Sequence, residues 1–202
     1  MHVAILSPYP QSLSATLERA GDTWTALHER VNAECLKDLG TDFVVSYGHP
    51  YILRDDVMTR FEGCLINLHI SYLPWNKGAD PNFWSFFDDT PKGVTIHCID
   101  SGIDSGAILV QEELQFDGGH TLASSYSLLR SAIEALFDRT WPAIRQGAVT
   151  AVPQAGPGTY HARKDKIPFF NGLPLGWETP ISVLKAMGKA YRERRDITGS
   201  PT

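Results

Sequence analysis

Three short apolar runs in the first third of the sequence constrain the fold of this chain more than any other feature. Each is followed by a turn or a loop, and they span His2–Leu6, Phe43–Tyr47 and Cys64–His69. Runs of this length that end in turn residues are typical of strands buried on both faces of a sheet. Stretches with helical spacing lie between them, at Gln11–Ala20, Glu29–Leu39 and Asp55–Phe61. Strands that alternate with helices predict an α/β sandwich around a mostly parallel sheet.

The same pattern continues through the second half of the chain. Two strands are predicted on either side of the loop DSGIDSG, at Val94–Ile99 and Ala107–Phe116. A long amphipathic helix is predicted over Thr121–Ile144, because apolar residues recur there at helical spacing, at Leu122, Tyr126, Leu129, Ile133, Leu136 and Phe137. A helical turn is expected at Asn82–Phe87 and a last helix from near Pro180, whereas Pro74–Pro81 is expected to be irregular. The short interval between the first strand and Glu29 leaves little room for a second strand–helix unit, so we expect an abbreviated first half.

The composition is that of an ordinary globular protein. The chain has 202 residues, 43% hydrophobic and 20% charged, which suits one compact domain with a short appendage. We place the domain at residues 1–150 and treat residues 151–202 as an extension packed on it. The net charge of −5 argues against nucleic acid as a partner. A basic cluster at residues 185–195, KAMGKAYRERR, is either a solvated helix face or an anchor for an anionic substrate or partner.

Cysteine usage and the N-terminus indicate the compartment. Cys35, Cys64 and Cys98 are far apart and form no CxxC pair, so neither a zinc site nor a disulfide framework is supported. We interpret them as core thiols. The start, MHVAILSPYP, lacks the basic region and cleavage signature of a signal peptide, and no apolar run approaches the ~20 residues of a membrane span. We therefore expect a cytoplasmic protein with no membrane partner.

An asparagine and a histidine stand together at the end of the third apolar run. Cys64–His69 reads CLINLH, and because successive side chains of a strand point to opposite faces, Asn67 and His69 share one face. Both would lie at the carboxyl end of a buried strand, where open α/β sheets bind ligands. Each alone has a structural explanation, as a strand-end hydrogen bond or a satisfied core histidine. Their combination indicates a functional site.

A second group of polar residues follows in the segment HCIDSGIDSG, residues 97–106. Two glycines and two serines bracket Asp104, so the loop can fold tightly and present its backbone amides. A carboxylate on such a loop between two strands is well placed to meet a site histidine. Asp100 is interpreted as a turn residue, and His97, which lies inside an apolar strand, as a buried structural histidine.

These segments resemble the 10-formyltetrahydrofolate-dependent formyltransferases. INLHISYLPWNKGADP and GVTIHCIDSGIDSGAILVQ are similar to the catalytic core of that family, and the likeness extends over Phe43–Gly147. The family includes glycinamide ribonucleotide, methionyl-tRNA and sugar-nucleotide N-formyltransferases. The resemblance implies a Rossmann-like three-layer sandwich, with residues 1–150 as the catalytic domain and Asn67, His69 and Asp104 as the catalytic trio.

The resemblance also implies where the co-substrate, 10-formyltetrahydrofolate, would bind. The segment Tyr47–Leu53 matches the family's folate loop. One wall of the pterin site is therefore expected at Tyr51, Ile52 and Leu53, and the other at Gly102, Ile103 and Asp104.

The chemistry fits these residue types. Formyl transfer between amines passes through a tetrahedral intermediate with a negative oxygen, which N–H groups of Asn67 and His69 would stabilise. Asp104 would favour the imidazolium form of His69 and accept a proton from the attacking amine. This chemistry needs neither a metal nor a nucleophilic Ser or Cys.

The range of possible amine acceptors is narrowed by excluding two branches of the family. The glycinamide ribonucleotide branch has a Gly-rich phosphate loop after its first strand, whereas residues 7–12 here read SPYPQS. Too few residues follow Gly147 for the tRNA-binding domain of the methionyl-tRNA branch. We therefore expect an amino sugar on a nucleotide, bound by Lys77, Gly78, Tyr160, Arg163 and Lys164.

Several alternatives stay open at this stage. A small free amine could be the acceptor, or water could replace it in a formyltetrahydrofolate hydrolase. The aromatic residues Trp75, Phe83 and Trp84 could line the acceptor pocket or pack in the core. Amphipathic C-terminal segments in such enzymes often build dimers, so a homodimer is one possibility, and the sequence does not fix the oligomeric state.

Overall fold

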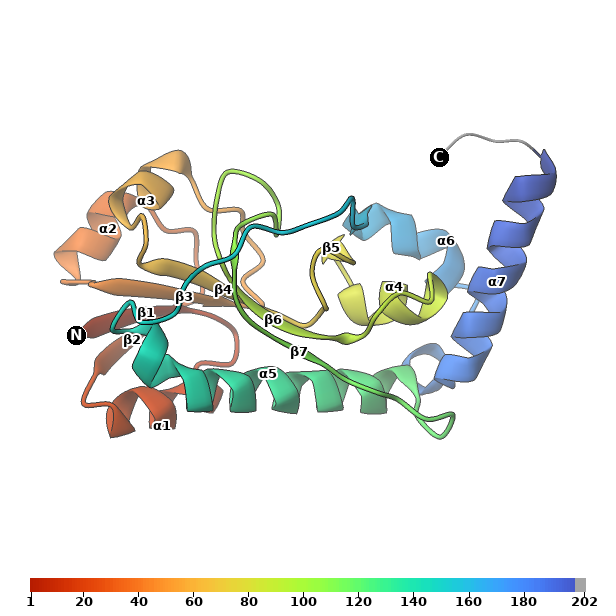
Figure 1. Ribbon diagram of the computed structural model, residues 1–202, viewed down its shortest axis with the longest axis horizontal. Helices are drawn as coiled ribbons and strands as arrows, with labels where there is room; N and C mark the ends of the chain where they lie inside the picture. Colours follow the sequence, from red (N-terminus) through yellow and green to blue (C-terminus); the bar gives the residue numbers. More distant parts are fainter. Residues whose placement is uncertain (199–202) are drawn as a thin grey trace.

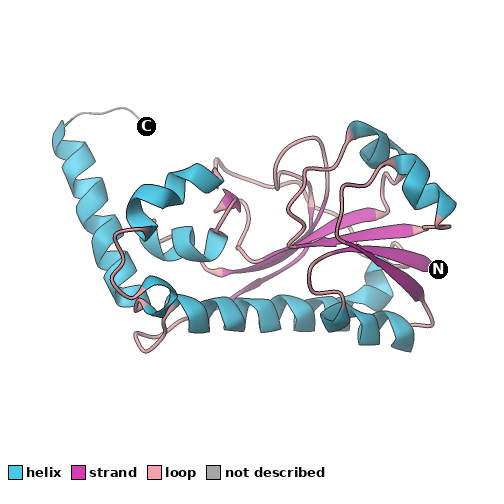
Figure 2. Ribbon diagram, turned by 180° about the vertical axis from the view of Figure 1, so that it is seen from behind, coloured by secondary structure: helices cyan, strands magenta, loops and turns pink. Residues whose placement is uncertain are grey.

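The computed structural model describes residues 1–198 and has an α/β fold in three layers (Figures 1 and 2). Its strands are β1 (His2–Leu6), β2 (Thr23–Leu27), β3 (Phe43–Tyr47), β4 (Leu65–His69), β5 (Lys77–Gly78), β6 (Gly93–Cys98), β7 (Ile108–Glu113) and β8 (Tyr160–His161). Its α-helices are α1 (Gln11–Arg19), α2 (Ala33–Asp38), α3 (Asp55–Arg60), α4 (Pro81–Phe87), α5 (Leu122–Ile144), α6 (Ile167–Phe170) and α7 (Ile181–Thr198). Two short 3₁₀ turns are η1 (Arg163–Lys166) and η2 (Gly176–Glu178). Residues 199–202 of the predicted extension lie outside the described residues.

Six strands form the central sheet, in the order β2-β1-β3-β4-β6-β7. The first four strands run parallel to one another. β6 pairs antiparallel with β4, and β7 pairs antiparallel with β6. The chain leaves β1 toward one edge of the sheet, forms β2, and returns to place β3 on the other side of β1. The strand order therefore reverses between β1 and β3, and the crevice beyond the carboxyl ends of such strands is where open α/β sheets bind ligands.

Helices cover both faces of this sheet. In Figure 1, α1 and α5 lie along one face and α2 and α3 along the other. The larger apolar core fills the space between the sheet and α1 and α5, with Val3, Leu17, Ile133 and Phe137 fully buried. A smaller core lies under α2 and α3. Full burial of each large aliphatic side chain contributes about 1.5–3 kcal/mol, so the two cores fix the position of every parallel strand.

The long helix α5 begins one residue later than expected, because Thr121 is its N-cap. The Thr121 hydroxyl accepts a hydrogen bond from the amide of Ser124 at 3.2 Å, and the Ser124 hydroxyl accepts one from the amide of Thr121 at 2.9 Å. Most of the predicted apolar stripe is buried in the core, with one exception. Tyr126 is half-buried and lines a cavity instead.

The helices α6 and α7 pack at one end of the molecule, beside α4 (Figure 1). There α4, α7 and the start of α5 enclose an aromatic core that includes Phe83, Trp84 and Phe87. A Cβ on Gly188 would lie 1.7 Å from the carbonyl oxygen of Phe87, so only glycine lets α7 approach α4 this closely. α7 begins at Ile181, in agreement with the expected start near Pro180. None of the helices in the described part of the chain combines the length and apolarity that a bilayer crossing requires.

The structure corrects two expectations about the first half of the fold. The first half is not abbreviated, because Thr23–Leu27 forms β2 at the edge of the sheet. Its side chains are mostly half-buried, so the apolar run that marks the inner strands is missing. The second helix spans Ala33–Asp38 rather than Glu29–Leu39, because Asn32 is extended and caps it by accepting a hydrogen bond from the amide of Cys35 at 2.8 Å.

Two further expectations are also wrong. Cys35 is exposed on α2 rather than buried as a core thiol, while Cys64 and Cys98 are half-buried. The segment Pro74–Pro81 is not wholly irregular, since Lys77–Gly78 forms β5. This strand pairs in parallel with β8, and the two make a separate two-stranded sheet.

Candidate active site

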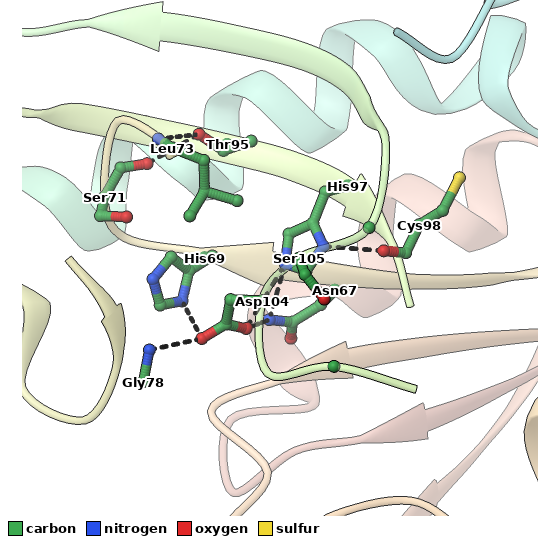
Figure 3. Close-up of polar contacts among 12 residues, drawn as sticks. Asn67, His69, Ser71, Leu73, Gly78, Thr95, His97, Cys98, Asp104 and Ser105 are labelled. Carbon is green, nitrogen blue, oxygen red and sulfur yellow. Dashed lines mark hydrogen bonds and ion pairs between the residues drawn. The ribbon is translucent and has the colours of Figure 1, made fainter. Parts of the chain in front are cut away.

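Strand β4 brings Asn67 and His69 to one face, where the loop after β6 meets them (Figure 3). The Asn67 amide nitrogen lies 3.2 Å from Oδ1 of Asp104, and Nδ1 of His69 lies 3.7 Å from Oδ2. The side chains of His69 and Asp104 are largely buried, at 8% and 14% exposure. The predicted trio is therefore brought together at the carboxyl end of a buried strand.

The loop that carries Asp104 is held by its own polar groups. Oδ1 of Asp100 accepts hydrogen bonds from the amide of Gly102 at 3.0 Å and the hydroxyl of Ser105 at 2.6 Å, which confirms a turn role for Asp100. Asp104 itself has φ of +50°, a left-handed conformation that aspartate tolerates better than most residues. A Cβ on Gly106 would lie 1.8 Å from the carbonyl oxygen of Cys98, so the loop can return beside β6 only with glycine there.

Asp104 is the centre of the polar cluster. Besides its contacts with Asn67 and His69, Asp104 accepts a hydrogen bond from the backbone amide of Gly78 at 2.8 Å. Burial by itself would raise the pKa of Asp104. The charge of His69 and the hydrogen bond from the Gly78 amide oppose that effect, and the pKa lies well below its usual value. Asp104 is therefore a carboxylate at neutral pH.

Both ring nitrogens of His69 face acceptor oxygens. Its Nε2 lies 3.1 Å from the backbone carbonyl oxygen of Asn76, so this nitrogen donates a proton. Its Nδ1 faces the carboxylate of Asp104. Asn76 is fully buried, and its side chain is bonded to Thr90 and Thr159. The carbonyl that orients the histidine is therefore fixed by the surrounding loops.

His97 belongs to the same cluster, although sequence reasoning assigned it only a structural role. It is buried, as expected, and its Nδ1 lies 2.8 Å from the carbonyl oxygen of Cys98, which makes Nδ1 the protonated nitrogen. Nε2 then accepts a hydrogen bond from the Asn67 amide at 3.2 Å. The NH₂ group of Asn67 is thus shared between His97 and Asp104.

A cavity of about 430 Å³ lies on one side of this cluster. We call it the loop cavity, because two loops form its walls. One wall contains Tyr51, Ile52 and Leu53, and the other contains Gly102, Ile103 and Asp104. Ile52 is 76% exposed and Ile103 is 43% exposed, so both offer apolar surface to a ligand. The two predicted walls therefore face a common space.

A second cavity of about 360 Å³ lies on the other side. We call it the tyrosine cavity, because Tyr9, Tyr47 and Tyr126 line it, together with His69, Asp80 and Arg130. It lies beyond the carboxyl ends of β1, β3 and β4. Both cavities share five residues, which we call the junction: His49, Asn67, Gly78, Asp104 and Arg163.

The predicted acceptor-binding residues are only partly gathered here. Gly78 and Arg163 line both cavities, and Tyr160 lines the loop cavity. Lys77 and Lys164 line neither of them. Phe83 and Trp84 belong to the aromatic core, so the core alternative holds for both.

Sequence reasoning missed His49 and Arg130. Both ring nitrogens of His49 are buried without a hydrogen-bond partner in residues 1–198, and burial, followed by the charge of His28, lowers the pKa of the ring. A neutral His49 at the junction is therefore an unsatisfied polar group that a ligand can pair with. The Gly-His-Pro sequence at residues 48–50 was a signal that could have found it.

The cluster has the properties of an acyl-transfer site. It combines a neutral amide, an imidazole and a deprotonated carboxylate where two cavities meet. N–H donors of this kind stabilise a negative oxygen that develops during reaction. Within the described residues, no group of three or more His, Cys, Asp or Glu side chains is arranged to hold a metal ion.

Comparison with known proteins gives consistent matches. The family model described as Formyl transferase matches residues 8–139. The chain is similar to the crystal structure of the formyltransferase PseJ from Anoxybacillus kamchatkensis in complex with UDP-4,6-dideoxy-4-formamido-L-AltNAc and tetrahydrofolate, with 44% identity and a TM-score of 0.89, over 93% of this chain and 100% of that one.

Two curated relatives match over a shorter range. The methionyl-tRNA formyltransferase of Thermodesulfovibrio yellowstonii is 33% identical over 129 residues, which are 62% of this chain and 41% of the relative. The dTDP-4-amino-4,6-dideoxyglucose formyltransferase of Mycobacterium bovis is 34% identical over 128 residues, which are 63% of this chain and 52% of the relative. The chain thus spans about half the length of these curated relatives.

Proposed function

Because this chain belongs to the formyl transferase family, we propose that it transfers a formyl group from 10-formyltetrahydrofolate to the amine of a nucleotide-linked amino sugar. The observation that carries the proposal is the junction, where Asn67 and Asp104 line two cavities at once. A reaction between two substrates needs a pocket for each and reactive groups where they meet. The loop cavity would hold the folate and the tyrosine cavity the amino sugar.

The folate assignment rests on the shape and chemistry of the loop cavity. Its walls combine exposed apolar side chains, Ile52 and Ile103, with backbone groups of a glycine-containing loop. A flat heteroaromatic ring that is bonded by backbone groups suits such a slot. The relative PseJ binds tetrahydrofolate, which supports a folate co-substrate for this chain as well.

The proposed mechanism gives each member of the trio one role. The amine attacks the formyl carbon, and the former carbonyl oxygen gains negative charge. Nδ1–H of His69 lies 3.7 Å from Asp104, longer than a hydrogen bond, so it remains available to donate to this oxygen. The Asn67 amide, held at 3.2 Å from both of its partners, can exchange one of these long bonds for a bond to the same oxygen.

Asp104 would move the proton that the reaction releases. The attacking nitrogen becomes positive and passes a proton to the carboxylate, directly or through water. Because the pKa of Asp104 is held low, its protonated form is a stronger acid than an ordinary aspartic acid side chain. It can therefore give the proton to the departing nitrogen of tetrahydrofolate, so that proton and charge balance over the cycle.

The tyrosine cavity supports a sugar acceptor over a small free amine. It contains three tyrosines and two arginines, groups that hydrogen-bond to hydroxyl and phosphate oxygens. The relative PseJ is bound to a UDP-linked formamido sugar, which makes a UDP-linked or dTDP-linked amino sugar the acceptor to test first.

The test is a side-by-side assay with 10-formyltetrahydrofolate. UDP-linked and dTDP-linked amino sugars, small free amines and buffer alone are each incubated with the enzyme, and mass spectrometry detects gain of one formyl group. We expect formylation of a nucleotide-linked amino sugar only. Formylation of a small amine alone would reject the sugar assignment, and release of formate in buffer alone at the same rate would identify a hydrolase.

A further inference from the structure

One charged residue of the tyrosine cavity is held in place from three sides. Arg130 lies on α5, with its guanidinium carbon 3.9 Å from the centre of the Tyr9 ring. Its Nε donates to the hydroxyl of Tyr47 at 3.3 Å, and its Nη2 donates to Glu134 at 3.2 Å. The Tyr47 hydroxyl also donates to Glu134 at 2.9 Å. The guanidinium is therefore fixed before any ligand binds.

These contacts leave part of the guanidinium unused. Arginine has five N–H donors, and the described residues pair only with Nε and Nη2 of Arg130. The side chain is 29% exposed and lines the tyrosine cavity, so a ligand there can reach the guanidinium. A rigid, partly paired guanidinium matches the oxygens of a phosphate group.

The tyrosine cavity is lined by both acidic and basic side chains. Asp104 at the junction attracts the amine that is to be formylated, and Arg130, although paired with Glu134, still offers N–H donors to an anion. The other acidic residue of the cavity, Asp80, is paired with Lys166. An acceptor with an amine at one end and an anionic group elsewhere would therefore place the amine at Asp104 and the anion at Arg130.

The start of α1 does not offer a competing phosphate site. The backbone amides of Ser12, Leu13 and Ser14 already donate to the carbonyl oxygens of Tyr9 and Pro10, at 3.1–3.2 Å. Helix N-termini bind phosphate through free amides, and these three are used. These three amides are therefore not free for an anion, which leaves the side chains of the cavity to hold it.

We propose that Arg130 binds a phosphate of the nucleotide diphosphate of the acceptor, and so sets the preference for nucleotide-linked over free amino sugars. This inference rests on the proposed function. It assigns the tyrosine cavity a phosphate-binding residue on α5, in addition to the reacting residues on β4. Arg163 lines both cavities, whereas Arg130 lines only the tyrosine cavity.

The experiment compares ligands with and without phosphate on Arg130→Gln and Arg130→Lys. Inhibition by UDP and by uridine is measured against the nucleotide-linked amino sugar that the wild type formylates. Loss of a charge-assisted contact should weaken UDP inhibition and raise the acceptor KM by about tenfold or more in Arg130→Gln. Uridine inhibition and the KM for 10-formyltetrahydrofolate should stay unchanged. Arg130→Lys keeps the charge but lacks the planar guanidinium. Its UDP inhibition and its acceptor KM should therefore lie between those of the wild type and of Arg130→Gln.

The matched control is Arg139→Gln on the same helix, whose guanidinium pairs with Glu112 and lines neither cavity. It should leave both inhibition constants as they are. Equal weakening of UDP and uridine in both Arg130 variants would overturn the inference, as would a wild type that millimolar UDP does not inhibit. If the wild type formylates the sugar nucleotide and Arg130→Gln does so with the same KM, only this inference fails. If the wild type formylates no sugar nucleotide, the proposed function itself fails.

Discussion

Replacing Asp104 by asparagine tests the centre of the proposed mechanism with almost no change in shape. The aspartate accepts hydrogen bonds on both oxygens, from the Gly78 amide on Oδ2 and from the Asn67 amide on Oδ1. Asparagine has one acceptor oxygen and one NH₂ group. In either orientation, its NH₂ group therefore faces an N–H donor.

The magnitude follows from that mismatch. A buried donor without an acceptor costs about 1–3 kcal/mol, so Asp104→Asn should lower the free energy of unfolding by that amount at neutral pH. Removal of a positioned proton acceptor should lower kcat by about 10²–10⁴-fold. The KM for the folate should change little, because the loop backbone that lines its cavity is retained.

The pH dependence supplies an independent check. The pKa of Asp104 in the folded protein lies below its unfolded value of about 3.9. The stability that this shift provides is present above that unfolded pKa and is lost as the pH falls through the folded pKa. The part of the difference in unfolding free energy between wild type and Asp104→Asn that comes from this shift should thus shrink below about pH 4.

The assay combines urea unfolding followed by fluorescence with steady-state kinetics of formyl transfer. Asp117→Asn is the control, because this aspartate is 83% exposed and lies away from both cavities. A kcat equal to that of the wild type would refute the role of Asp104. A stability difference that persists unchanged to the lowest pH at which both proteins fold would refute the argument from its pKa.

Three further changes have defined expected outcomes. His69→Ala should reduce kcat by about 10²–10³-fold, the typical loss for one oxyanion donor, and rapid-quench kinetics should place the loss in the chemical step. Gly78→Ala would put a Cβ 2.4 Å from a carbonyl oxygen of β8 and should lower both the melting temperature and kcat, whereas Gly63→Ala, at similar positive φ with no atom within 4 Å, should lower only the melting temperature. Asp22→Asn should destabilise the fold by about 3–5 kcal/mol, since its fully buried carboxylate pairs with Arg145 at 2.6 Å, and urea unfolding should show this loss while kcat at a temperature where the variant is folded stays unchanged.

The sequence was most informative about strands that are buried on both faces. β1, β3 and β4 produce continuous apolar runs because helices cover them from both sides. β2 lies at the sheet edge and reads TWTAL, with two threonines in five residues, so it lacks the continuous apolar run of the inner strands. β5 and β8 have only two residues each and pair across more than eighty positions of sequence, so no local pattern could indicate them.

The membership of the formyl transferase family was also predictable, and the family match confirms it. Asn67 and His69 share a strand, so their common face followed from periodicity alone. The contacts of Asp104 with Gly78 and of Asn67 with His97 depend on how distant loops meet, and no spacing rule describes such a meeting. Arg130 was missed for a related reason, because a charged residue on an amphipathic helix is usually solvated.

The junction between the two cavities has a thermodynamic consequence. His49, Asn67, Gly78, Asp104 and Arg163 belong to the walls of both pockets. A ligand that repositions any of them in one pocket therefore alters the affinity of the other. Linkage requires the effect to be reciprocal, so the factor by which the first ligand changes the binding of the second equals the factor by which the second changes the binding of the first. The dissociation constants of the two ligands are therefore properties of a ternary system, and each has a defined value only at a stated concentration of the other.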